Sequence, residues 1–187
     1  MSLQLITPPS VEPVTLADTK LHLKVDTSDD DALIARLITA ARARAEWHTG
    51  RALNTQSWIL WLDCWPQCGV IEIPLPPLQS VSSVTAYAPD DSATVLDAAT
   101  YQVDAASAPA RLILKSTVLP PMNLRAINAV AIAFTAGYAD VATDVPAGFR
   151  AAILELIAFL YEHRGEAPAE LPLDCLALLA PFRVLHL

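Results

Sequence analysis

The hydrophobic pattern of this chain changes period twice. Over Asp30–His48 apolar residues recur every three or four positions, as on one face of a helix: Leu33, Ile34, Leu37, Ile38, Ala41 and Ala45. From Gln56 the period becomes two, which is typical of a strand with one buried face. The helical period returns over Pro146–Arg164. This order predicts an α+β fold in which a β-rich insertion separates two long amphipathic helices.

The ends of these helices carry recognisable signals. Thr15 and Asp18 form a capping box, so we expect a short helix over Leu16–Leu23. The acidic run Asp29–Asp31 is better explained as capping of the first long helix than as a calcium loop, which needs alternating oxygen ligands and a distal Glu. Gly50 should end that helix. Gly165 and Pro168 should end the second one, before a short final helix over Leu173–Leu179.

The β-rich insertion is expected to contain several short strands. Prolines and Asp-Ser turns separate segments of alternating or β-branched residues. The predicted strands are Ser57–Leu62, Val70–Ile73, Val81–Tyr87, Thr94–Leu96, Tyr101–Val103, Arg111–Leu114 and Asn128–Thr135. We therefore expect one domain, 1–187, with an N-terminal helical part (1–55), a β-rich insertion (56–136) and C-terminal helices with a tail (137–187). Upstream of the first helix, the prolines of Ile6–Pro13 predict an extended arm.

The composition indicates a protein that associates with other copies. Of 187 residues, 53% are hydrophobic, and the mean hydropathy is +0.38, which exceeds what a small interior can hold. The sequence predicts no membrane span, because its charge-free stretches are short or rich in proline. The net charge is −8 without a basic tract, which argues against binding nucleic acid through its phosphates.

The sequence offers no constellation that points to catalysis. His22, His48, His163 and His186 lie near expected helix ends or the chain end, where a solvated His is the ordinary explanation. Cys64 and Cys68 lack a second pair of ligands that would complete a metal site. We therefore predict no catalytic residue, no cofactor and no metal. Of the four tryptophans, Trp58 and Trp61 should lie on opposite faces of one strand, so core packing and an interface role both stay open for them.

Six blocks of sequence, in this order and spacing, resemble the head–tail connector family of tailed phages, also described as head-completion or adaptor proteins. They are Val14–Asp26, Asp30–Leu53, Pro74–Val84, Phe134–Asp140, Val145–Arg164 and Leu171–Val184. The chain looks like the larger subtype of the family, in which a β insertion separates the helical elements. The stretch Val95–Asn128 and the turn Cys64–Gly69 match no family pattern.

The resemblance implies a structural virion protein at the head–tail interface, assembled in the host cytoplasm. Such proteins form a ring of about twelve subunits that docks on the portal, extends the DNA channel and receives the tail or a stopper protein. DNA passes through such a ring without sequence-specific binding, and an acidic lumen would let it slide. The alternatives are a small cytoplasmic enzyme or ligand-binding domain, or another virion protein such as a tail-completion protein.

The resemblance also directs two hypotheses about contact residues. Arg36, Arg42 and Arg44 on the first long helix would pair with Glu155 and Glu162 of an adjacent subunit. The C-terminal segment Pro181, Phe182, Arg183 and Val184 would contact the portal or another partner.

Overall fold

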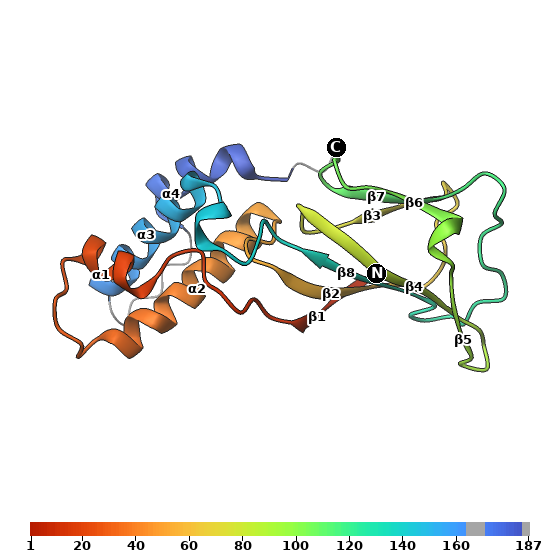
Figure 1. Ribbon diagram of the computed structural model, residues 1–187, viewed down its shortest axis with the longest axis horizontal. Helices are drawn as coiled ribbons and strands as arrows, with labels where there is room; N and C mark the ends of the chain where they lie inside the picture. The colour runs from red at the N-terminus through yellow and green to blue at the C-terminus, as the bar shows by residue number, and fades with distance from the viewer. Residues whose placement is uncertain (164–170, 185–187) are drawn as a thin grey trace. The chain divides into compact units, whose positions relative to one another are not determined.

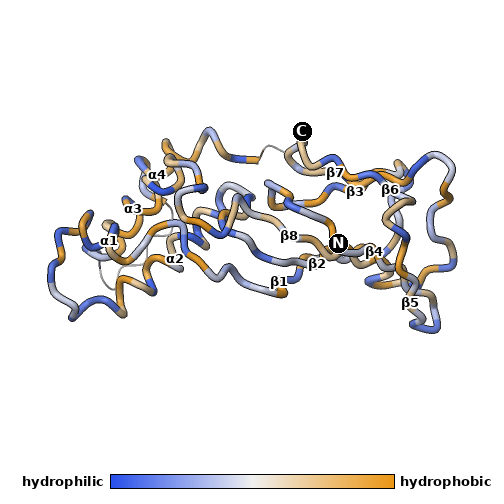
Figure 2. The backbone as a smooth tube through the Cα atoms, in the orientation of Figure 1, coloured by the Kyte–Doolittle hydropathy of each residue, from blue (hydrophilic) through white to orange (hydrophobic). Residues whose placement is uncertain are grey.

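The computed structural model describes residues 1–163 and 171–184. The chain divides into two compact units, each built from two separate stretches. The β-rich unit comprises Met1–Pro8 and Thr55–Gly137, and the helical unit comprises Pro9–Asn54 and the described residues from Tyr138 onward. Polar and apolar residues alternate along the elements of both units (Figure 2). The predicted α+β class is confirmed (Figure 1).

The described residues of the helical unit form four α-helices close to the predicted ones: α1 (Leu16–Leu23), α2 (Asp31–Thr49), α3 (Ala147–Glu162) and α4 (Leu173–Leu179). Thr15 caps α1 as predicted, because its hydroxyl accepts from the Asp18 amide and donates to the Asp18 carboxylate. Gly50, with φ of +68°, ends α2 in the left-handed conformation. Gly165 and Pro168 lie outside the described residues.

The acidic run lies at the start of α2 as predicted, with Asp31 in the first turn, but it does not cap the helix through a side-chain hydrogen bond. Asp30 occupies the N-cap position of α2, yet its side chain makes no capping hydrogen bond. Instead the Tyr161 hydroxyl of α3 donates to the Asp30 carboxylate, and Asp31 forms a 2.7 Å ion pair with Lys20 of α1. These carboxylates therefore join α2 to its two neighbouring helices, a role that local sequence spacing does not reveal.

The predicted apolar faces of α2 and α3 form the core of the helical unit. The residues that are fully or almost fully buried include Ile34, Ile38, Ala41, Ala45, Phe149, Ile153, Leu156 and Ile157. Cys175 and Leu179 of α4 join the same cluster. The Cys175 thiol packs on α3, where it donates to the Ala152 carbonyl. This core therefore joins helices that are far apart in sequence, from α2 to α4.

The β-rich unit consists of two antiparallel sheets. The five-stranded sheet has the order β1 (Ser2–Thr7), β2 (Gln56–Leu62), β8 (Val130–Ala136), β4 (Leu78–Tyr87) and β5 (Ala93–Val95). The three-stranded sheet has the order β3 (Val70–Ile73), β7 (Ala110–Leu114) and β6 (Tyr101–Asp104). Seven of these eight strands were predicted with boundaries within about three residues, which is ordinary for sequence patterns.

Strand β1 was not predicted. It pairs with β2 in antiparallel register, so that Leu3 lies opposite Leu60 and Leu5 opposite Trp58. All six of its residues are exposed. The prolines that predicted an extended arm follow the strand, and residues 1–8 belong to the β-rich unit.

One face of the five-stranded sheet is the apolar one. Leu60, Ile132 and Val84 are neighbours across β2, β8 and β4, and all three are fully buried. Ile71, Ile73 and Leu112 are buried in the three-stranded sheet with the same alternation. Each sheet thus has one apolar face, the arrangement from which antiparallel sheets build a shared core.

Candidate functional site

Arg42, one of the three expected interface cations, lies inside its own unit. Only 10% of its side chain is exposed. Its Nε donates to Glu12 at 2.7 Å, and its Nη1 donates to Glu46 at 2.6 Å. The second oxygen of Glu46 accepts from the Leu53 amide. Arg42 therefore holds the arm before α1 against α2 within one chain.

The other expected interface residues lie nearer the surface. Arg36 is exposed, and its Nε donates to the Ala32 carbonyl of its own helix. Arg44 is half-buried, and Glu155 and Glu162 are exposed on α3. Glu155 lies 3.9 Å from His22 of α1. Their pairing across subunits stays a prediction.

The C-terminal segment expected to contact the portal packs partly on its own unit. The Phe182 ring lies 4.4 Å from the Phe149 ring, between centroids, and the Phe182 carbonyl accepts from Arg51 Nε. The Val184 amide donates to the Thr49 carbonyl at 2.9 Å. Pro181 and Arg183 are exposed. Of this segment, these two residues present the freest side chains to a partner.

The tryptophans divide between the core and the surface. Trp65 is buried, and Trp58 and Trp61 are half-buried. The Trp61 indole donates to Gln4 of β1 at 3.0 Å, and its ring lies 6.0 Å from the Tyr87 ring. Trp47 on α2 is 84% exposed. An indole this exposed is unusual outside interfaces, so Trp47 is the aromatic residue best placed for a partner.

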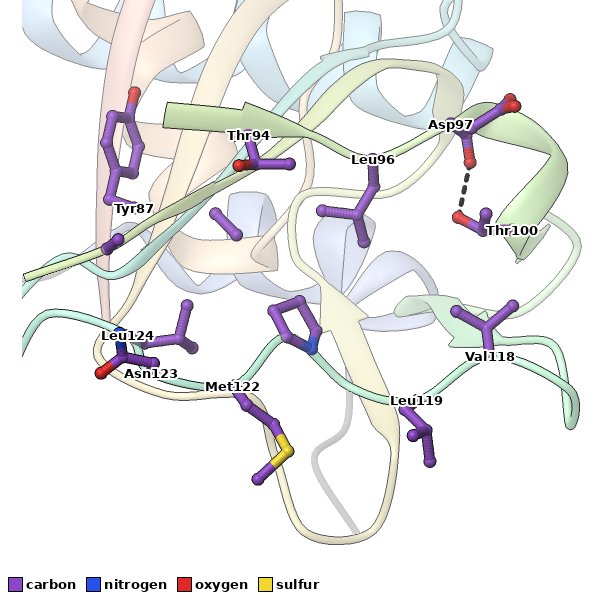
Figure 3. Close-up of a pocket in the computed structure, with 13 residues that line it drawn as sticks. Tyr87, Thr94, Leu96, Asp97, Thr100, Val118, Leu119, Met122, Asn123 and Leu124 are labelled. Atoms are coloured by element: carbon purple, nitrogen blue, oxygen red, sulfur yellow. Dashed lines mark hydrogen bonds between the residues drawn. The ribbon is translucent and has the colours of Figure 1, made fainter. Parts of the chain in front are cut away.

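The β-rich unit contains an apolar groove of about 330 Å³ between the β4–β5 turn and the loop that follows β7. In Figure 3, Leu96 and Val118 turn toward this groove, whereas Leu119 and Met122 point away from it. Leu119 is 81% exposed and Met122 is 83% exposed. Most residues that line the groove belong to the stretch Val95–Asn128 that matched no family pattern. Its exposed apolar side chains offer a contact surface rather than a reactive centre.

The titratable groups with shifted pKa values do not converge on one site. Hydrogen bonds from Ser107 and Arg111 hold the pKa of Asp104 well below its usual range, at an exposed turn of the β-rich unit. Burial raises the pKa of the Cys175 thiol in the helical core. Within residues 1–163 and 171–184, no group of His, Cys, Asp and Glu is arranged to hold a metal ion.

The remaining sequence candidates are ordinary surface groups. Cys64 and Cys68 are exposed free thiols. The His163 ring contacts the Phe159 carbonyl at 2.9 Å. His186 lies outside the part of the chain that the structure describes. Among the described helices, none combines the length and the hydrophobicity needed to cross a bilayer.

The chain is similar to one known protein family and to known structures. Residues 13–105 match the family model described as phage gp6-like head–tail connector protein. A chain in the neck of an empty gene transfer agent particle, computed with C6 symmetry, superposes with a TM-score of 0.83 at 25% identity over 100% of this chain and 97% of the other. No curated protein sequence matches.

Two further solved structures have the same fold along the whole chain. A chain of the virion of the native gene transfer agent gives a TM-score of 0.84 at 24% identity, over 100% of this chain and 97% of the other. A chain of the neck of the native particle, computed with C12 symmetry, gives 0.82 at 25% identity over the same shares. The resemblance inferred from the six sequence blocks is therefore confirmed: residues 13–105 match the phage gp6-like head–tail connector family, and the whole chain has the fold of the neck proteins.

Proposed function

We propose that this protein is a structural virion protein, one subunit of a ring of about twelve copies at the neck of a phage-like particle. The observation that carries the proposal is the fold match over 100% of the chain to a neck protein whose particle was computed with C12 symmetry. The ring sits below the portal, extends the DNA channel and provides the platform for the tail or stopper protein. It assembles in the host cytoplasm.

The exposed apolar side chains support association with other chains. Among the described residues, five large hydrophobic ones are more than four-fifths exposed, in both units: Leu21, Trp47, Leu119, Met122 and Leu173. Burying an apolar side chain against a neighbour stabilises a complex by roughly 25 cal/mol per Å² removed from water. A ring gives every copy two neighbours, so two different surfaces of one chain become covered.

The charge of the protein fits a passage for DNA. The net charge of −8 repels phosphate, so duplex DNA moves past such a surface without being held. Sequence-specific binding is not part of the proposal.

The proposal includes one contact between subunits and one contact with the portal. Arg36 and Arg44 of one subunit pair with Glu155 and Glu162 of the next, while Arg42 supports α2 from inside through Glu12 and Glu46. Pro181 and Arg183 contact the portal, while Phe182 fixes their position by packing on Phe149.

Light scattering over a concentration series, alone and with purified portal, tests the assembly. We expect a ring-sized species in at least one of the two conditions. A protein that stays monomeric in both would contradict the proposal. The double variant Arg36→Glu, Arg44→Glu should lose the ring, whereas Lys24→Glu, an exposed charge reversal on the same unit, should keep it.

Portal binding is tested separately. The variant Arg183→Glu should weaken capture of the protein by immobilised portal, and Lys115→Glu, an exposed reversal in the β-rich unit, serves as its control. Equal capture of both variants and of the parent protein would remove Arg183 from the portal contact.

A further inference from the structure

The helical unit contains a groove with a cation that has no hydrogen-bond or ion-pair partner among the residues that the structure describes. This groove, here named the Arg150 groove, has a volume of about 480 Å³ and lies between α1 and the first half of α3. Its wall is mainly apolar and includes Pro13, Val14, Leu21, Ala142 and Leu154. Val14 is buried, whereas Leu21 is 81% exposed. The groove therefore combines a buried apolar floor with Leu21, an apolar side chain that is exposed to solvent.

Arg150 supplies the positive charge of this groove. Its Nε is buried and has no hydrogen-bond partner, and no ion pair with it occurs among the described residues. The other charged groups of the groove have partners of their own. Asp18 accepts from the Thr15 hydroxyl, and His22 lies 3.9 Å from Glu155. A buried donor without a partner costs free energy, so this arginine favours an incoming acceptor.

The outer face of α4 has the complementary character. Leu173 is 82% exposed and Leu178 is 36% exposed. Asp174, also exposed, has no hydrogen bond or ion pair with any residue that the structure describes. Cys175 and Leu179 face the core. The helix thus presents two leucines and one carboxylate to the surroundings. This matches an apolar groove whose one arginine has no partner within residues 1–163 and 171–184.

The two surfaces lie on opposite faces of α3. Ala152 accepts the hydrogen bond from Cys175 of α4, and Gly148 is in contact with Phe182 and near the Leu178 carbonyl. Arg150 and Leu154 line the groove. Positions two apart on a helix are separated by about 200° around its axis, so α4 and the groove point in opposite directions. A copy cannot fill its own groove with its own α4.

We propose that α4 of one copy docks in the Arg150 groove of a second copy. Leu173 and Leu178 cover the groove's apolar wall, and the Asp174 carboxylate accepts from the Arg150 guanidinium. The contact joins α4 on one copy to a different surface, the Arg150 groove, on the next copy. Such a contact between unlike surfaces is the geometry of a head-to-tail ring. The inference rests on the proposed ring and names one of its contacts.

Reciprocal charge reversal tests the ion pair. Arg150→Glu and Asp174→Lys should each raise the concentration needed for half-maximal association by about tenfold or more, because each leaves like charges facing one another. The double variant should recover to within about threefold of the parent protein, since it restores opposite charges. Asp26→Lys and Lys115→Glu, exposed reversals of the same sign, should have no such effect. Circular dichroism checks that every variant is folded.

Disulfide trapping tests the contact independently of its strength. Leu21→Cys and Leu173→Cys are made in separate proteins that carry Ser at the exposed Cys64 and Cys68. We expect a covalent heterodimer when the two proteins are mixed and oxidised, alone or on the portal. Each protein oxidised by itself controls for random collision.

The outcomes distinguish this contact from the ring itself. A ring that forms without the crosslink and without sensitivity to the reversals would overturn the α4 contact and leave the proposed function standing. A crosslink without a ring would support the contact and contradict the ring. If neither the ring nor the crosslink forms, both proposals are overturned.

Discussion

Removing the Arg42 guanidinium should destabilise the helical unit even in the absence of any partner. The side chain is 10% exposed, and those of its carboxylate partners Glu12 and Glu46 are 28% and 13% exposed. The variant Arg42→Ala deletes both ion pairs, leaves the largely covered Glu46 carboxylate without this cation, and removes the packed stem of the arginine. A hydrogen bond to a charged group contributes about 1.5–3 kcal/mol, and breaking a buried pair costs about 3–5 kcal/mol.

The partial exposure of Glu12 places the expected loss at the lower end, about 3 kcal/mol. Urea unfolding followed by circular dichroism at 222 nm, a helix signal, measures it. Arg36→Ala, an exposed change on the same helix, should stay within about 0.5 kcal/mol of the parent. A loss below about 1 kcal/mol for Arg42→Ala would refute the inference that this arginine is a buried intrachain support. In that case its earlier assignment to a subunit interface would regain its basis.

Three further predictions concern local features. Gly148→Ala should destabilise the protein by about 1–3 kcal/mol in thermal unfolding, because a Cβ there would lie 2.7 Å from the Phe182 ring; an unchanged melting temperature would contradict this. Ser107→Ala should raise the pKa of Asp104 toward its usual range in an NMR titration, because the variant removes the Ser107 hydrogen bond that lowers this pKa. The lowered pKa corresponds to stability that is present at neutral pH and lost as the carboxylate is protonated in acid. Cys175 should react with a thiol reagent more slowly than the two exposed cysteines, and equal rates would argue against its burial.

The helices were predictable because their signals are local. The apolar positions of α2 repeat within one helix, Thr15 and Asp18 are three residues apart, and Gly50 follows the last turn directly. The alternation in β2 is equally local, since it depends only on neighbours in the chain. Hydrophobic periodicity therefore defined the α+β class and most element boundaries.

The features that were missed depend on partners distant in sequence. Every residue of strand β1 is exposed, so the strand has no buried face that would produce alternating hydrophobicity in its sequence. It is held by pairing with a strand more than fifty residues later. Asp30 follows the rule for a cap, but Tyr161 provides a partner that no local spacing reveals. The ion pair of Arg42 with Glu12 joins residues thirty apart. Exposed charge and buried charge look the same in a sequence.

The division of both units into two stretches of chain has a consequence for synthesis. The β-rich unit needs β1 from the beginning of the chain, and its last strand ends at Ala136. The helical unit has α1 and α2 early, but it lacks a partner for its apolar face until α3 ends at Glu162. At about 5–20 residues per second, α2 waits roughly 5–20 s for α3 on the ribosome. The β-rich unit therefore has all its strands first. During this delay the apolar face of α2 lacks α3, and it is a surface that a chaperone would have to protect.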